Sequence, residues 1–109
     1  MKINIQSLHF TAPAELNNFV LDKVNKLEEF DHKIVAGQVC LKLDKSTTLD
    51  NKVCEIRLEV PGNDLFAKKQ STTFEEATTL AVKALEHQME KTKSIKLKKI
   101  KNKSIESNE

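Results

Sequence analysis

The sequence predicts an α+β fold, in which two helices pack on one face of a four-stranded sheet. Three observations support this prediction. The hydrophobic periodicity changes along the chain in the order β-α-β-β-β-α. Both predicted helices are apolar on one side only, and the strands alternate apolar and polar side chains, so one face of the sheet is expected to be buried. A chain of 109 residues with 39% hydrophobic and 31% charged residues fits a single globular domain.

The chain begins with a predicted strand and a predicted helix. Residues 2–6 alternate polar and apolar side chains, which is the pattern of a half-buried strand. Thr11 stands where its side chain can cap the next helix, with Pro13 in the first turn, where a missing N–H costs nothing. We expect this helix to run to about Phe30. Its apolar residues, spaced by three and four, are Leu16, Phe19, Val20, Val24 and Leu27.

Two further strands are predicted in the middle of the chain, at residues 34–44 and at residues 52–60. Residues 45–51 between them are mostly polar and predict a hairpin loop. The inward-facing side chains are expected to be Val39, Leu41, Leu43, Cys54, Ile56, Leu58 and Val60. Glu55, Arg57 and Glu59 are expected to face outward, as is Cys40.

The last two predicted elements are an edge strand and a long helix. Residues 61–64 predict a turn and residues 65–70 a fourth strand, although alternation leaves its buried face undecided. Thr72 or Thr73 is expected to cap the second helix, which has two acids in its first turn. Its predicted apolar side comprises Phe74, Ala77, Ala81, Ala84, Leu85 and Gln88, widened by Leu80, Val82 and Met89.

Charge divides the chain into two parts. Residues 1–90 carry 11 basic and 14 acidic side chains, whereas residues 91–103 carry seven lysines and no acid. A basic segment beside a mildly acidic body indicates a polyanionic partner, because lysines placed on phosphates release counterions. We therefore predict one α+β domain at residues 1–95 and a basic, flexible C-terminal tail at residues 96–109.

No catalytic or metal-binding pattern is found. The three histidines lack ligand spacing, the two glycines form no phosphate-binding loop, and the adjacent glutamate pairs diverge on their helices. Cys40 and Cys54 are expected on opposite faces of the sheet, so they cannot form a disulfide. The sequence predicts no enzyme, cofactor, metal, small-molecule substrate or membrane span, and its cysteine usage fits the cytoplasm.

The polar sides of both helices carry basic rows. Lys23 and Lys26 lie three residues apart on the first helix, and Lys83, His87 and Lys91 lie four apart on the second. Such rows can contact phosphates without reading bases. Glu28, Glu86 and Glu90 interrupt the rows, as on an ordinary solvated helix face. Because the chain has no Trp or Tyr and its outer sheet face is expected to be polar, a base-stacking sheet is not expected.

Four segments, in order and spacing, resemble the short form of the ribosome hibernation-promoting factor family, whose members are also called ribosome-associated inhibitors or ribosomal subunit interface proteins. Residues 1–11 are similar to the start of the family, and residues 19–28 to its first helix with a Lys-x-x-Lys-Leu core. Residues 61–67, Pro-Gly-Asn-Asp-Leu-Phe-Ala, resemble its turn and fourth strand. Residues 85–93 resemble the Leu-Glu-Arg-Gln signature of the second helix.

The resemblance implies the same β-α-β-β-β-α fold and a non-catalytic role in ribosome hibernation. The implied partner is the small ribosomal subunit with its rRNA, bound in the channel for messenger RNA and the A- and P-site transfer RNAs. Translation would be blocked and the idle ribosome preserved. Long family members carry a C-terminal dimerisation domain, and this sequence shows none.

Several positions depart from the family pattern. Ala84, His87 and Glu90 stand where the family usually has a basic residue, and two lysines, at positions 68 and 69, stand where acids are common. Thr72-Thr73-Phe74 replaces the usual Asp-x-Tyr. The expected rRNA-binding residues are Lys23, Lys26, Lys68, Lys69, Lys83, His87, Lys91 and Lys93.

Two other functions fit the same residues. The chain could be a general RNA-binding module that recognises duplex RNA by shape, or a compact protein-interaction domain whose basic tail only aids solubility. Steep salt dependence would separate both RNA-binding hypotheses from the protein-interaction domain. Ribosome co-sedimentation would then separate the hibernation factor from the general module.

Overall fold

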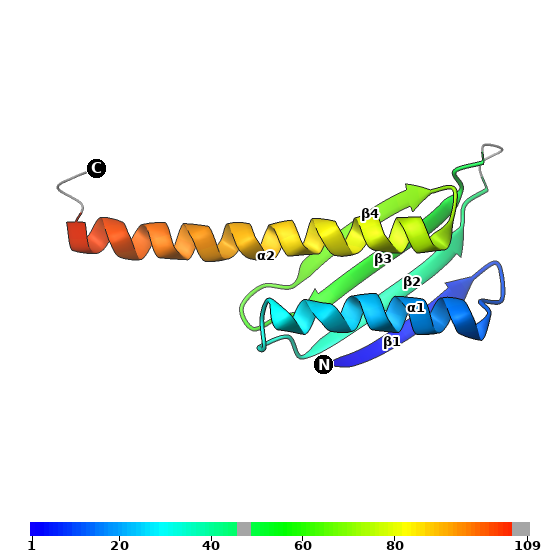
Figure 1. The fold of residues 1–109 in the computed structure, drawn as a ribbon, viewed down its shortest axis with the longest axis horizontal. Coiled ribbons are helices and arrows are strands. Elements are labelled where there is room, and N and C mark those ends of the chain that lie inside the picture. Colours follow the sequence, from blue (N-terminus) through cyan, green and yellow to red (C-terminus); the bar gives the residue numbers. More distant parts are fainter. Residues whose placement is uncertain (46–48, 106–109) are drawn as a thin grey trace.

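The computed structural model describes residues 1–45 and 49–105, with side chains described as far as Lys91. The predicted order β-α-β-β-β-α is confirmed (Figure 1). The elements are β1 Lys2–Leu8, α1 Ala14–Asn25, the 3-10 helix η1 Lys26–Glu29, β2 Ala36–Leu43, β3 Lys52–Glu59, β4 Leu65–Ser71 and α2 Phe74–Ile105. No helix in the described part of the chain is long and apolar enough to cross a membrane.

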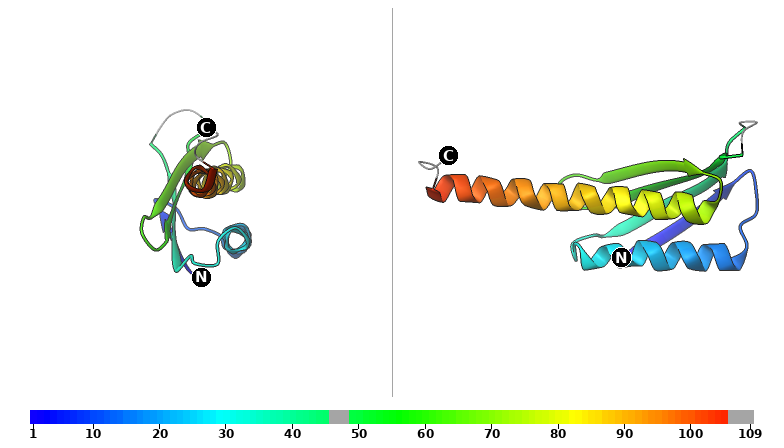
Figure 2. Two further views of the ribbon diagram at one scale, coloured as in Figure 1. Left: turned by 90° about the vertical axis from the view of Figure 1, so that its left-hand side faces the viewer. Right: turned by 45° about the horizontal axis from the view of Figure 1, so that its top comes forward.

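The four strands form one sheet in the order β1-β2-β3-β4, so β1 and β4 are its edges. β1 pairs with β2 in parallel, and the other two pairs are antiparallel. α1 and α2 lie side by side on one face of this sheet, as both views of Figure 2 show. The described residues leave the opposite face uncovered, and this uncovered side is called the open face below.

The core lies between the sheet and the two helices. One row of paired residues, Ile5, Val39, Ile56 and Ala67, crosses all four strands on the helix-covered face. Val20 and Val24 of α1 pack against this face and are fully buried. α2 contributes Ala77, Ala81, Val82, Leu85 and Met89. Small alanines let the backbone of α2 approach the sheet closely, which keeps the interior densely packed.

Both helix starts were predicted, but only one cap is right. The Thr73 hydroxyl accepts a hydrogen bond from the Glu76 N–H at 3.1 Å, which confirms Thr73 as the cap of α2. The prediction that Thr11 caps α1 is wrong. Pro13 is the cap residue, and its carbonyl accepts from the N–H groups of the residues three and four positions later. No side chain caps this end, because the proline side chain has no atom that can accept a hydrogen bond.

Three other expectations concern the two helices and the end of the domain. The first helix does reach the region of Phe30, although its last turn, η1, is a 3-10 helix. Leu80 does not widen the apolar side of α2, since it points outward and is 40% exposed. α2 continues beyond residue 95, the predicted end of the domain. That boundary and the flexibility of the tail stay predictions, and residues 46–48 and 106–109 lie outside the described part of the chain.

Candidate nucleic-acid interface

The end of α1 and the start of η1 carry the first basic row. Lys23 lies in the last turn of α1, and Lys26 is the first residue of η1. The Lys23 ammonium sits 5.5 Å from the centre of the Phe19 ring, within the range of a cation–π contact. This contact orients the Lys23 side chain along the helix surface, while Lys26 is exposed. Buried Val20 and Val24 fix the helix, so both cations project from a rigid support.

The middle of α2 carries the second basic row. Lys83, His87 and Lys91 are all exposed and lie one turn apart on the side of α2 that faces away from the sheet. Lys26, Lys83 and Lys91 form no ion pair with any residue whose side chain is described, so their charges remain available to an external anion. Lys93 continues α2, but its side chain lies outside the described residues.

The two lysines of β4 do not belong to one surface. Lys68 pairs in the sheet with Glu55 and lies on the open face, where its ammonium is 3.8 Å from a Glu55 carboxylate oxygen. Lys69 pairs with buried Cys54 and therefore points to the helix-covered side, at the exposed edge of the sheet. The pleat of a strand sends neighbouring side chains to opposite faces. Of the two, only Lys69 lies on the same side of the sheet as the helical rows.

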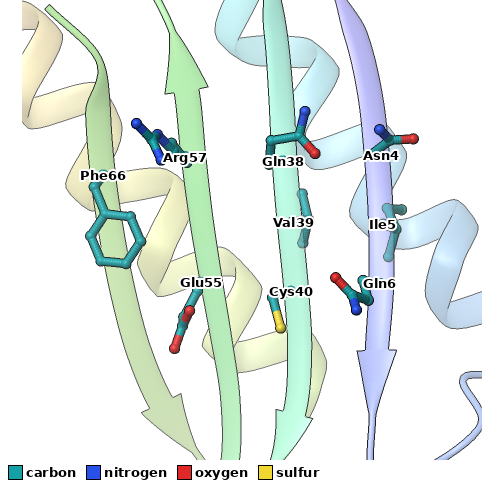
Figure 3. Close-up of a pocket in the computed structure, with 9 residues that line it drawn as sticks. All are labelled: Asn4, Ile5, Gln6, Gln38, Val39, Cys40, Glu55, Arg57 and Phe66. Atoms are coloured by element: carbon teal, nitrogen blue, oxygen red, sulfur yellow. The ribbon is translucent and has the colours of Figure 1, made fainter.

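The open face carries an exposed aromatic residue that the alternation of β4 did not indicate. Phe66 on β4 is 52% exposed, whereas its neighbour Ala67 is buried. The face was expected to be polar, and Phe66 is a large apolar side chain that is exposed on it. Figure 3 shows its ring beside Arg57, with Gln38 and Asn4 on the next two strands. The signal in the sequence was Ala67, because a small apolar residue suits the core better than an exposed edge. The alternation of residues 65–70 alone does not decide which side of this strand is buried.

Both cysteines are free, as predicted. Cys54 is buried against α2 and accepts a hydrogen bond from the Thr78 hydroxyl at 3.6 Å. Its burial raises the pKa of the thiol to about 11. Burial and the nearby Glu55 carboxylate also raise the pKa of the half-buried Cys40 thiol. Both thiols therefore stay protonated near neutral pH and are poor nucleophiles.

No metal site is formed by the described residues, among which no three His, Cys, Asp or Glu side chains come close enough to hold an ion. What the structure does offer is a layer of two rigid helices with unpaired cations on its outer side. These features define a small α+β domain whose helices carry rows of lysines interrupted by acids, and the seven lysines of residues 91–103 continue along α2. Such lysines suit a polyanion.

Comparison with known proteins identifies its relatives. Residues 3–103 match the family described as Sigma 54 modulation protein / S30EA ribosomal protein, and the chain belongs to this family. Two proteins of Pseudomonas putida, each named ribosome hibernation promoting factor, are 30% identical to it over 93 residues. The matched region spans 85% of this chain and 87% of each relative.

Two solved structures share the fold. A ribosomal subunit interface protein from Coxiella burnetii superposes with a TM-score of 0.77 at 19% identity, covering 86% of this chain and 99% of that one. The N-terminal domain of Protein Y from Thermus thermophilus gives a TM-score of 0.73 at 19% identity, covering 84% of this chain and 99% of that one. At this level of identity the two similarities establish the fold alone.

Proposed function

We propose that this protein is a non-catalytic ribosome hibernation factor, acting in the cytoplasm, that occupies the mRNA and tRNA channel of the small ribosomal subunit. The names of its relatives support the ribosome as the partner. The observation that carries the proposal is the helical face, on which Lys26, Lys83 and Lys91 are exposed and unpaired within the described residues.

The geometry suits binding by shape and charge. Two helices held side by side present cations at fixed spacing, and fixed groups lose little conformational entropy when they meet phosphates. Phosphate contacts set position and orientation without reading sequence. A folded domain held in this way in the channel would exclude messenger RNA and transfer RNA by its volume, which requires no chemical step.

Co-sedimentation with purified small subunits tests this function. The protein is expected to pellet with the subunits in the presence of excess duplex RNA, because a channel contacts it on several sides and a duplex offers only one groove. Transfer RNA bound beforehand in the A and P sites should prevent pelleting. If duplex RNA strips the protein from the subunits, the chain is a general shape-reading RNA-binding module instead.

A further inference from the structure

The open face carries a row of four exposed side chains with complementary chemistry. The strand register places Asn4 beside Gln38, Gln38 beside Arg57, and Arg57 beside Phe66. Figure 3 shows two amides, a guanidinium group and an aromatic ring in this order across the sheet. The row lines a shallow hollow of about 410 Å³, a volume within the range of small-ligand sites.

The charges on this face are largely compensated by one another. A Glu55 carboxylate oxygen lies 2.8 Å from the Lys42 ammonium and 3.8 Å from that of Lys68. The Arg57 guanidinium lies 3.1 Å from the Asp64 carboxylate. An extended phosphate backbone would therefore find little net attraction here. The hollow favours a neutral ligand.

The side chains of the row indicate which class of neutral ligand fits the hollow. Phe66 is the one exposed large apolar residue among those described on the open face, since Val35, Leu49 and Leu80 lie elsewhere. A protein partner would need a broader apolar patch, and an extended peptide would pair with an edge strand instead of the face. A single planar ring with polar edges fits, because it stacks on an aromatic side chain while amides and a guanidinium bind its edges.

Two amides on the same face have unused capacity. The side chains of Asn4 and Gln6 form no hydrogen bond with any described residue. The Gln38 amide donates to Glu59 only at 3.5 Å, the outer limit of a hydrogen bond. These groups can therefore bond a ligand without first breaking strong contacts, and each can both donate and accept.

We infer that the open face binds one unpaired nucleobase of RNA, stacked on Phe66 and held at its edges by Arg57, Gln38 and Asn4. This inference rests on the proposed function and adds a base contact to the phosphate contacts of the helices. It also gives the two faces of the domain separate tasks. The helical face binds backbone, and the open face binds a base that the RNA fold leaves unstacked.

A base-dependent binding experiment tests the inference. The chain has no Trp or Tyr, so the fluorescence of 2-aminopurine in a single-stranded RNA can be followed without overlapping protein emission. We use an oligomer of about eight nucleotides and a matched oligomer of the same length in which every base is removed. The wild-type protein is expected to quench 2-aminopurine and to bind the base-bearing oligomer more tightly.

Phe66→Ala is expected to weaken binding of the base-bearing oligomer about fivefold to a hundredfold and to leave the abasic oligomer unchanged. Phe66→Tyr should retain the quenching, because it keeps the ring. Val35→Ala removes another apolar side chain, 60% exposed and outside the hollow, and serves as the matched control. Thermal unfolding of each variant shows whether the fold is intact.

The inference is overturned if the wild-type protein causes no quenching, or if Phe66→Ala weakens both oligomers equally. Failure of the base site and failure of the proposed ribosomal function give different results. If the variant has no base-dependent effect while the wild type still pellets with small subunits, only the base site is lost. If quenching depends on Phe66 but subunits are not bound, the base site stands and the ribosomal function fails.

Discussion

Neighbouring side chains on β4 point to opposite sides of the sheet, and this alternation separates Phe66, Lys68 and Lys69. Phe66 and Lys68 lie on the open face, while Lys69 lies on the side of the helices. A sequence shows only that the two lysines are adjacent. The face of the sheet on which each lysine lies is set by the pairing of β4 with β3. This pairing is a tertiary contact, and the local sequence pattern does not reveal it.

Cys54 provides a test at the scale of one residue. Its thiol has a folded-state pKa of about 11, raised from the ordinary value of 9.0 by burial. In the unfolded chain the thiol ionises first, so the stability contributed by Cys54 is fully present below about pH 9 and is lost as the pH rises towards 11. The loss expected from the shift is about 2 to 3 kcal/mol.

The measurement is urea unfolding at pH 8 and pH 10.5 for the wild type and for Cys54→Ala. The variant is expected to be less stable at pH 8 but to lose less stability on going to pH 10.5, since the other titrating groups are shared by both proteins. Cys40→Ala, on the less buried thiol, should keep most of the pH dependence. An identical pH dependence in wild type and Cys54→Ala would contradict the predicted role of burial.

At the scale of elements, the sequence predicted the strands and helices well because each element has its own periodicity. The inward residues of β3 follow from local alternation. The sequence limited the cap of α2 to Thr72 or Thr73, each three residues before a glutamate, and the structure selects Thr73. The start of α1 could not be read in the same way. Thr11 and Pro13 both suit a helix start, and only the path of the chain from β1 decides between them.

The candidate site was predictable only in part. The rows on α1 and α2 follow from helical spacing, so Lys23, Lys26, Lys83 and Lys91 were correctly placed on helix surfaces. Whether any of them contacts rRNA stays a prediction. The hollow on the open face joins residues from all four strands and has no signature within any one of them.

The two parts of the basic surface differ in rigidity, which gives a prediction about their importance. Lys23→Glu with Lys26→Glu is expected to weaken small-subunit binding by at least about tenfold, and by more than deletion of residues 96–109. The first two lysines stand on helices packed against a core, whereas a helix end without packing partners is only marginally stable in water.

Equilibrium binding to fluorescently labelled small subunits measures both effects. Lys2→Glu with Lys45→Glu makes the same change in charge at exposed positions outside the helical rows and serves as the control. The opposite ranking, with the deletion more harmful than the double reversal, would move the main binding site to residues 96–109.

At the scale of the whole molecule, the charges of the helical face predict how binding depends on salt. If Lys23, Lys26, Lys83 and Lys91 each contact one phosphate, the logarithm of the binding constant should fall with the logarithm of salt concentration with a slope of about −3 to −4. Titration of subunit binding over a range of potassium chloride at constant magnesium gives this slope. The double reversal of Lys23 and Lys26 should reduce the magnitude of this slope by about two. A slope near zero for the wild type would favour a protein-interaction domain.

The length of α2 has a further consequence for what a distant partner encounters. The helix continues past the end of the sheet (Figure 1), and at about 1.5 Å per residue Lys103 lies roughly 18 Å beyond Lys91 along its axis. Electrostatic fields in physiological salt decay over about 8 Å, so this distance exceeds two screening lengths. The acids of residues 1–90 therefore do not cancel the lysines at the far end of α2. The seven lysines of residues 91–103 therefore concentrate positive charge along this part of α2, although the chain as a whole carries only +2.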